Sequence, residues 1–102
     1  MIERIAMLKL KPEHGGPVGR AAMARRAAEA LRPIPGVLSV TVGGPADEGS
    51  AKSWDLVVTA RFASLADADA YRMHPAHRRF VDEIVAPCCE VWKAWTFEVE
   101  SR

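Results

Sequence analysis

The sequence predicts a single α+β domain whose strands and helices follow one another in the order β-α-β-β-α-β. Two observations lead to this prediction. Some segments carry apolar residues at every second position, which is the period of a strand, and the segments between them carry apolar residues at helical spacing. The chain has 102 residues, so residues 1–102 are expected to form one domain. This order is that of the ferredoxin-like plan, an antiparallel sheet with both helices on one face.

The first half of the chain supplies two strands and one helix. Residues 2–11 are predicted to form a strand whose middle, IAML, is apolar on both pleat faces. A helix is expected over residues 18–32, with Pro17 suited to the first helical position because its missing N–H is not needed there. The apolar stripe of this helix is expected to contain Ala21, Ala24, Ala28 and Leu31. Its arginines are interpreted as a solvated face: Arg20, Arg25, Arg26 and Arg32. Residues 37–44 form the second strand, with one apolar face made by Leu38, Val40 and Val42.

The second half supplies the other two strands and a broken helix. Residues 45–53 are expected to form a polar loop of a long hairpin, and residues 54–63 a strand with an apolar face and a mixed face that includes Asp55. Ser64 is expected to cap a helix that breaks at His74, because a residue before proline avoids the helical region. A second helical piece covers residues 76–85, and Pro87 ends it. Residues 88–100 form the last strand, one face of which carries Val91, Trp95, Phe97 and Val99.

Several of these strands are apolar on both faces, which predicts self-association. Two helices on one side of a sheet leave its other side bare, and a bare apolar face is a large exposed patch. The simplest cover is a second copy of the chain, with two sheets packed face to face about a two-fold axis. We therefore expect a homodimer.

Composition and charge narrow the classes of function. Fourteen basic and 13 acidic residues give a net charge of +1, so neither nucleic acid nor an anionic membrane is an expected partner. The start of the chain alternates and carries charge, unlike a signal peptide, and a cytoplasmic location is expected. Cys88 and Cys89 are adjacent, and they are interpreted as reduced apolar residues. No Cys/His cluster has the spacing of a metal site, so no metal or other cofactor is expected.

Four segments, taken together, resemble the stress-responsive dimeric α/β-barrel domain, Dabb. They are IERIAMLKLK at the start, IPGVLSVTVG at residues 34–43, WDLVVTARFASLADADAYRMHPAHRRFV at residues 54–81, and the closing hydrophobic strand. The resemblance covers nearly the whole chain and keeps the order of the elements. It implies a ferredoxin-like subunit that joins its sheet to that of a second subunit in a shared barrel.

The resemblance also suggests site residues. A plant polyketide cyclase that resembles this family closes a linear polyketide in its barrel cavity. It uses the tyrosine and the second histidine of Y-x-x-H-P-x-H, which match Tyr71 and His77 here. Many family members have a histidine in the first strand where this chain has Arg4, and the cyclase has another where this chain has Leu56. Arginine does not lose its proton at neutral pH, but Arg4 can bind an anionic or enolate oxygen.

The residues themselves leave alternatives open. A histidine titrates near neutrality, so His77 and Tyr71 are candidates for an acid/base pair; the alternative is that His77 satisfies backbone groups at the helix break and Tyr71 fills the barrel rim. His74 is expected to cap the broken helix or point outward. A His74/His77 metal site lacks a third ligand. The residues expected to contact a ligand are Arg4, Trp54, Leu56, His74 and Phe80.

Three functions are compatible with these features. The first is a small homodimeric protein that binds an apolar or aromatic molecule in a cavity between sheet and helices. The second is a cofactor-independent enzyme, similar to a polyketide cyclase or an antibiotic-biosynthesis monooxygenase, that uses His77 and Tyr71. The third is a purely structural role as an assembly unit.

Overall fold

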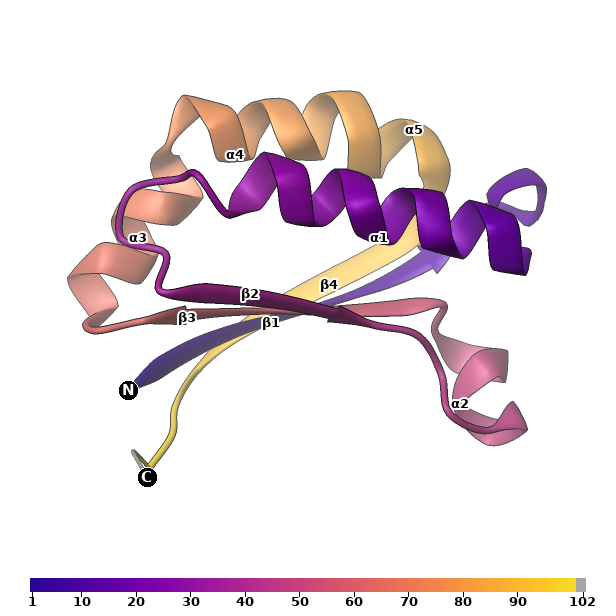
Figure 1. The fold of residues 1–102 in the computed structure, drawn as a ribbon, viewed down its shortest axis with the longest axis horizontal. Helices are drawn as coiled ribbons and strands as arrows, with labels where there is room; N and C mark the ends of the chain where they lie inside the picture. The colour runs from indigo at the N-terminus through magenta and orange to yellow at the C-terminus, as the bar shows by residue number, and fades with distance from the viewer. Residues whose placement is uncertain (101–102) are drawn as a thin grey trace.

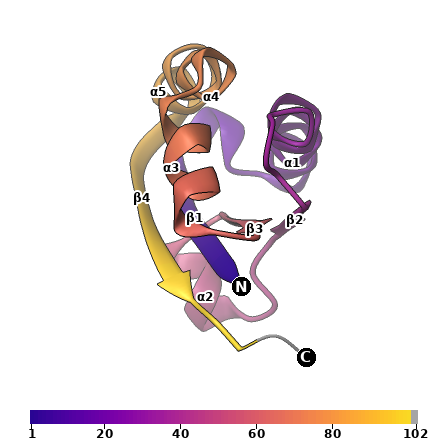
Figure 2. The same cartoon turned by 90° about the vertical axis from the view of Figure 1, so that its left-hand side faces the viewer.

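The computed structural model describes residues 1–100 and confirms the predicted plan of one antiparallel sheet with its main helices on one face (Figures 1 and 2). The strands lie in the order β2-β3-β1-β4, so β1 and β3 are central and β2 and β4 are the edges. The strands are β1 (Ile2–Leu10), β2 (Ser39–Gly43), β3 (Leu56–Phe62) and β4 (Cys89–Glu98). The helices are α1 (Pro17–Leu31), α2 (Glu48–Ser53), α3 (Leu65–Met73), α4 (Pro75–Phe80) and α5 (Ala86–Cys88). Pro12–His14 form a short 3-10 turn, and Val81–Val85 form a π-helical segment between α4 and α5.

The core lies between the sheet and the helices. In β3, alternate residues are buried, as strand geometry requires when one face packs on helices: Leu56, Val58, Ala60 and Phe62. From β1, Ile2, Leu8 and Leu10 reach the same core, and Phe80 and Val85 contribute from the helical layer. This face of the sheet therefore holds the buried apolar residues of the domain.

Helix α1 buries a different stripe from the predicted one. Pro17 does begin the helix, but the buried residues are Met23, Ala27 and Leu31, and Ala21 is exposed. Of the predicted stripe, only Leu31 is fully buried. Alanine occurs almost all round this helix, so the sequence offers little contrast between its faces, and the larger Met23 and Leu31 decide which side packs.

The connection between β2 and β3 is helical, which corrects the predicted polar loop. The Asp47 side chain caps α2 by accepting a hydrogen bond from the Ser50 backbone N–H at 2.7 Å. β2 is also shorter than predicted. Leu38 lies before it and is 58% exposed, so it does not share the buried face of Val40.

The second helical region breaks where the sequence predicts. Ser64 caps α3, and His74 has φ −67° and ψ 138°, an extended conformation between α3 and α4. The region continues further than predicted, because Val85 and Ala86 keep helical backbone angles and Pro87 lies within α5 instead of ending the helix. Cys88 is therefore helical, and β4 begins at Cys89.

The face of the sheet away from the helices is open and carries exposed large apolar residues, together with Lys93 and the ion pair between Glu3 and Arg61. Val91, Trp95 and Phe97 are each exposed by 43% or more on edge strand β4. The strand register places Ile5 of β1 between Thr59 and Trp95, and Met7 beside Val57. We call Ile5, Met7, Val57, Val91, Trp95 and Phe97 the outer face; its apolar character agrees with the prediction from the sequence.

Candidate functional site

A cavity of about 120 Å³ lies between the sheet and the helices. Its wall is mostly apolar and comes from β1, β3, β4, α1 and the α4 region. Among its lining residues are Leu8, Leu31, Val58, Phe80, Val85 and Trp92. Three polar side chains, Arg4, Tyr71 and His77, also line it. An apolar hollow with a few converging polar groups is the usual form of a small-molecule site.

The helix break brings Tyr71 and His77 together. Tyr71 lies in the last turns of α3 and His77 in the first turn of α4, on either side of the extended His74. Their ring centroids are 4.6 Å apart with planes tilted by 55°. On its other side Tyr71 packs against Phe62 of β3, at 4.9 Å between ring centroids. Tyr71 is buried and His77 is half-buried, so the pair lies at the edge of the core.

The surroundings favour the neutral form of both rings. Burial raises the pKa of Tyr71 to about 12, against a smaller opposing effect of the Arg4 charge. The pKa of His77 is lowered, first by burial and then by the charge of Arg4, although the Arg72 backbone favours the protonated ring. At neutral pH the arrangement therefore offers a phenol that can donate a proton beside an imidazole that can accept one.

Arg4 brings an incompletely neutralised charge to this cavity. Its Nη1 donates a hydrogen bond to the Thr96 hydroxyl on β4 at 2.9 Å. Burial lowers the pKa of Arg4, as does the nearby charge of Arg72, and the arginine is half-buried. Across residues 1–100, Arg4 makes no ion pair with a carboxylate. The guanidinium keeps free N–H groups for a further partner.

The structure places the predicted ligand-contacting residues in three different positions. Arg4 and Phe80 join Tyr71 and His77 at the cavity. His74 instead caps α4, because its Nδ1 accepts a hydrogen bond from the Ala76 backbone N–H at 3.0 Å. Trp54 and Leu56 line a different hollow, of about 290 Å³, beside the connection from β2 to α2.

Trp92 lines the cavity, although the sequence alone does not show whether it packs in the core, at a dimer face or at a cavity wall. It lies opposite Leu8 in the register of β4 against β1, and Ala94, two residues further on, lines the same cavity. The alternation along the last strand already separates Trp92 and Ala94 from Val91 and Trp95. The sequence does not indicate which of these two faces of the strand packs against the helices.

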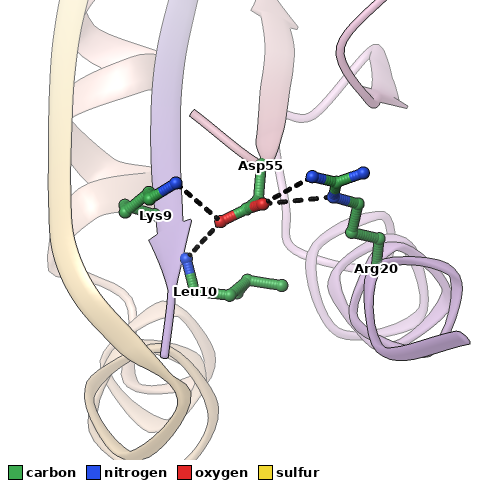
Figure 3. A network of polar contacts seen from close by, with 4 residues as sticks. All are labelled: Lys9, Leu10, Arg20 and Asp55. Atoms are coloured by element: carbon green, nitrogen blue, oxygen red, sulfur yellow. Dashed lines mark hydrogen bonds and ion pairs between the residues drawn. The ribbon is translucent and has the colours of Figure 1, made fainter. Parts of the chain in front are cut away.

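A second polar cluster lies at the other end of β1, around the buried Asp55 (Figure 3). Its Oδ1 accepts hydrogen bonds from Arg20 Nε at 3.1 Å and Arg20 Nη2 at 2.9 Å. Its Oδ2 accepts one from the Leu10 backbone N–H at 2.8 Å and lies 3.8 Å from Lys9 Nζ. This corrects the prediction that Arg20 belongs to a solvated face and that Asp55 lies on a merely mixed one. The cluster ties α1, β1 and the start of β3 together.

A metal site, a cysteine nucleophile and a membrane-spanning helix have little support in the described part of the chain. Residues 1–100 contain no group of three or more His, Cys, Asp or Glu side chains placed to hold a metal ion. Cys88 and Cys89 are buried free thiols, and burial raises the pKa of Cys89 to about 11, which disfavours a thiolate nucleophile. None of the helices described has the length and apolar character needed to cross a membrane.

Comparison with known structures shows the same fold. A Dabb family protein from Mesorhizobium loti with a ferredoxin-like fold is 19% identical, with a TM-score of 0.81 over 98% of this chain and 97% of that one. A dimeric ferredoxin-like protein of unknown function from Thermobifida fusca is 22% identical, with a TM-score of 0.76 over 96% and 90%. A putative antibiotic biosynthesis monooxygenase from Deinococcus radiodurans is 15% identical, with a TM-score of 0.73 over 100% and 95%. At these identities the likeness concerns the fold alone.

Comparison of the sequence with protein families gives the assignment. No curated protein matches the chain significantly. The family model of the stress responsive A/B barrel domain, Dabb, matches residues 2–99, which is nearly the whole chain. The matched range contains all four strands of the sheet. The protein therefore belongs to the Dabb family.

Proposed function

We propose that this protein is a homodimer that binds a small apolar or aromatic molecule in the cavity between sheet and helices, without a cofactor. The observation that carries the proposal is the apolar cavity at which Arg4, Tyr71 and His77 converge. Its volume of about 120 Å³ is close to the roughly 150 Å³ of an apolar cavity that takes up benzene, so a single aromatic ring is a suitable size.

The outer face supports the dimer. Trp95 is 44% exposed and Phe97 50% exposed on the same edge strand, beside the half-buried Ile5 and Met7. An apolar patch of this kind is stabilised by burial against another surface. The same face on a second copy is complementary by symmetry. The dimeric description of the Thermobifida fusca relative agrees with this. The two buried free cysteines suit a reducing compartment, and we extend the proposal to a cytoplasmic location.

An acid/base reaction is the second candidate, and the contact between the rings of Tyr71 and His77 is the observation that favours it. A neutral His77 can remove a proton next to a carbonyl, and the Tyr71 hydroxyl can donate to the enolate oxygen that forms. The monooxygenase description of the relative from Deinococcus radiodurans is compatible with small-molecule chemistry in this fold.

Ligand binding can be tested with p-cresol and NMR of the side-chain methyl groups. We expect saturable shift changes in Leu8 and Val58, which line the cavity. Ala6→Leu fills part of the cavity and should abolish them, whereas Ala21→Leu, on the exposed side of α1, should leave them unchanged. Absence of saturable shifts in the wild type would contradict the proposed binding. Turnover of candidate carbonyl substrates that disappears in His77→Gln would favour the enzyme instead.

The dimer can be tested by analytical ultracentrifugation at micromolar concentration. Trp95→Glu places a charge in the outer face and should shift the protein to a monomer. Val18→Glu is the matched control, because Val18 is 85% exposed at the start of α1, away from the outer face. A monomeric wild type would contradict the dimer.

A further inference from the structure

We propose that the ligand is an apolar carboxylic acid, held with its apolar body in the cavity and its carboxylate at the cavity mouth by Arg4, with Arg72 and Arg78 beside it. This inference rests on the proposed binding function and specifies the ligand class. It follows from the shape of the mouth, from its charges and from the unfilled hydrogen-bonding capacity of Arg4.

The mouth is a second hollow that adjoins the cavity. It has a volume of about 210 Å³ and is lined by Arg4, Arg72, His77, Arg78, Val81 and Asp82. Arg4, His77 and Val81 line the cavity as well, so the same three side chains form part of both walls. The apolar cavity therefore continues into a hollow whose lining is largely polar.

The charges at the mouth are predominantly positive. Arg72 has Asp69 at 3.5 Å, but that pair is exposed on both sides and weakly held. Asp82 is also exposed at the rim. Arg4 is the deepest of the three arginines, and no carboxylate of residues 1–100 forms an ion pair with it. The position left for a negative group is therefore next to Arg4.

A carboxylate fits this position better than a neutral oxygen. A guanidinium presents a planar fork of N–H donors that matches both oxygens of a carboxylate, and hydrogen bonds between charged partners are the stronger ones. Arg4 uses one donor on Thr96. An alcohol could accept one bond from the remaining donors but would leave the half-buried charge uncompensated.

The experiment compares ligands that differ only in the head group. The probes are 3-phenylpropanoate, 3-phenylpropan-1-ol and 3-phenylpropylamine, titrated into the protein at pH 7.5 with NMR of the Leu8 and Val58 methyl groups as readout. We expect the acid to bind about tenfold more tightly than the alcohol at low salt, the effect of one charged hydrogen bond, and the amine to bind most weakly. The preference for the acid should fall as salt is added.

Substitutions of Arg4 test whether this residue causes the preference for the acid over the alcohol. Arg4→Met should remove it while leaving the affinity for the alcohol within about threefold, since the apolar cavity stays intact. Arg4→Lys keeps the charge without the fork, so it should retain a smaller preference; it also serves if Arg4→Met folds poorly, as judged by circular dichroism. Arg25→Met removes an exposed arginine of α1 and should change nothing.

The possible outcomes show whether the carboxylate inference fails alone or together with the binding proposal. Equal affinities of the wild type for acid and alcohol would overturn the carboxylate inference and leave the binding proposal standing. A full preference that persists in both Arg4 variants would overturn the assignment to Arg4. If neither acid nor alcohol binds, both proposals fail together.

Discussion

At the Leu10 end of β1, Asp55 is surrounded by donors from Arg20, Lys9 and the Leu10 backbone (Figure 3). Towards the other end of β1, Arg4 has one hydroxyl partner, from Thr96, and no carboxylate among the described residues. Arg4 and Leu10 are six positions apart along the strand, which corresponds to about 20 Å. Both clusters hold a charged side chain partly or fully away from bulk water. Only the Asp55 charge is balanced by oppositely charged side chains of the described residues.

The difference separates a contribution to the fold from a candidate for binding. A buried carboxylate with all its partners fixes the elements that supply them, and removal of one member leaves the others unsatisfied. A charged group with free donors at a cavity gives little to the fold and can gain a partner from outside. We therefore expect changes at Asp55 to lower stability and changes at Arg4 to alter binding.

Among the changes that largely keep the size of the side chain, the largest effect is expected for Asp55→Asn. The amide is nearly the same size as the carboxylate, but it lacks the negative charge that balances Arg20 and Lys9. We expect the free energy of unfolding to fall by about 3 kcal/mol, the loss typical of a broken buried ion pair. Urea denaturation followed by circular dichroism measures it. Glu29→Gln makes the matched change on the exposed side of α1 and should stay within about 0.5 kcal/mol of the wild type.

If Asp55→Asn and Glu29→Gln lower stability equally, the Asp55 cluster does not hold the elements together as inferred. A small loss at Asp55 accompanied by a similar small loss at Arg20 would point to the same conclusion.

A smaller effect of the opposite sign is expected for Arg4→Met. The change removes a half-buried charge that has no carboxylate partner among residues 1–100, and methionine covers much of the same apolar wall. We expect the free energy of unfolding to stay the same or rise by about 1 kcal/mol in the absence of ligand, since apolar replacement of a desolvated charge is often neutral or stabilising. Thermal unfolding of the two proteins side by side measures it. A loss as large as that of Asp55→Asn would show that Arg4 is structural.

A pH-dependent effect is expected at His77. Its pKa is lowered in the folded state by burial and by Arg4, from an unfolded value of 6.5. Between the two values the unfolded chain binds more protons, so stability falls as the pH drops below 6.5 and levels off below the folded pKa. The His77 contribution is thus fully present above pH 6.5. Urea denaturation from pH 7.5 to pH 4.5 should show a smaller acid-side loss in His77→Gln, and NMR titration of the wild-type ring should give a midpoint below 6.5. A midpoint above 6.5 would contradict the assigned environment.

The Asp55 cluster and the Tyr71–His77 pair also differ in how well the sequence predicts their contacts. Tyr71, His74 and His77 are close in sequence, and Pro75 fixes the break between them, so their arrangement is predicted by local rules. Arg20 and Asp55 are 35 positions apart, and nothing local marks them as partners. Each of them looks like an ordinary surface charge until the fold is known. The Asp55 cluster is therefore harder to predict than the pairing of Tyr71 with His77.

Two further differences have local causes. The segment before β3 has Asp47 three residues ahead of Ser50, a spacing suited to a helix cap, but its glycine and serine residues favour the interpretation as a loop. In α1, repeated alanines hide the packed side, and only Met23 and Leu31 indicate it. β3 is predicted well because every second residue along it belongs to one unbroken apolar face.

The smallest effect is expected for Tyr71→Phe, which tests whether an unpaired polar atom at the cavity contributes to the fold. Within residues 1–100 the Tyr71 hydroxyl has no hydrogen-bond partner, whereas its ring packs between Phe62 and His77. Phenylalanine keeps both ring contacts, so we expect the free energy of unfolding to change by no more than about 0.5 kcal/mol. Tyr71→Ala, which removes the ring, should cost about 3 kcal/mol or more. Urea denaturation distinguishes the two. A large loss in Tyr71→Phe would mean that the hydroxyl is bonded within the fold, and the cavity would then lose the donor that an acid/base reaction requires.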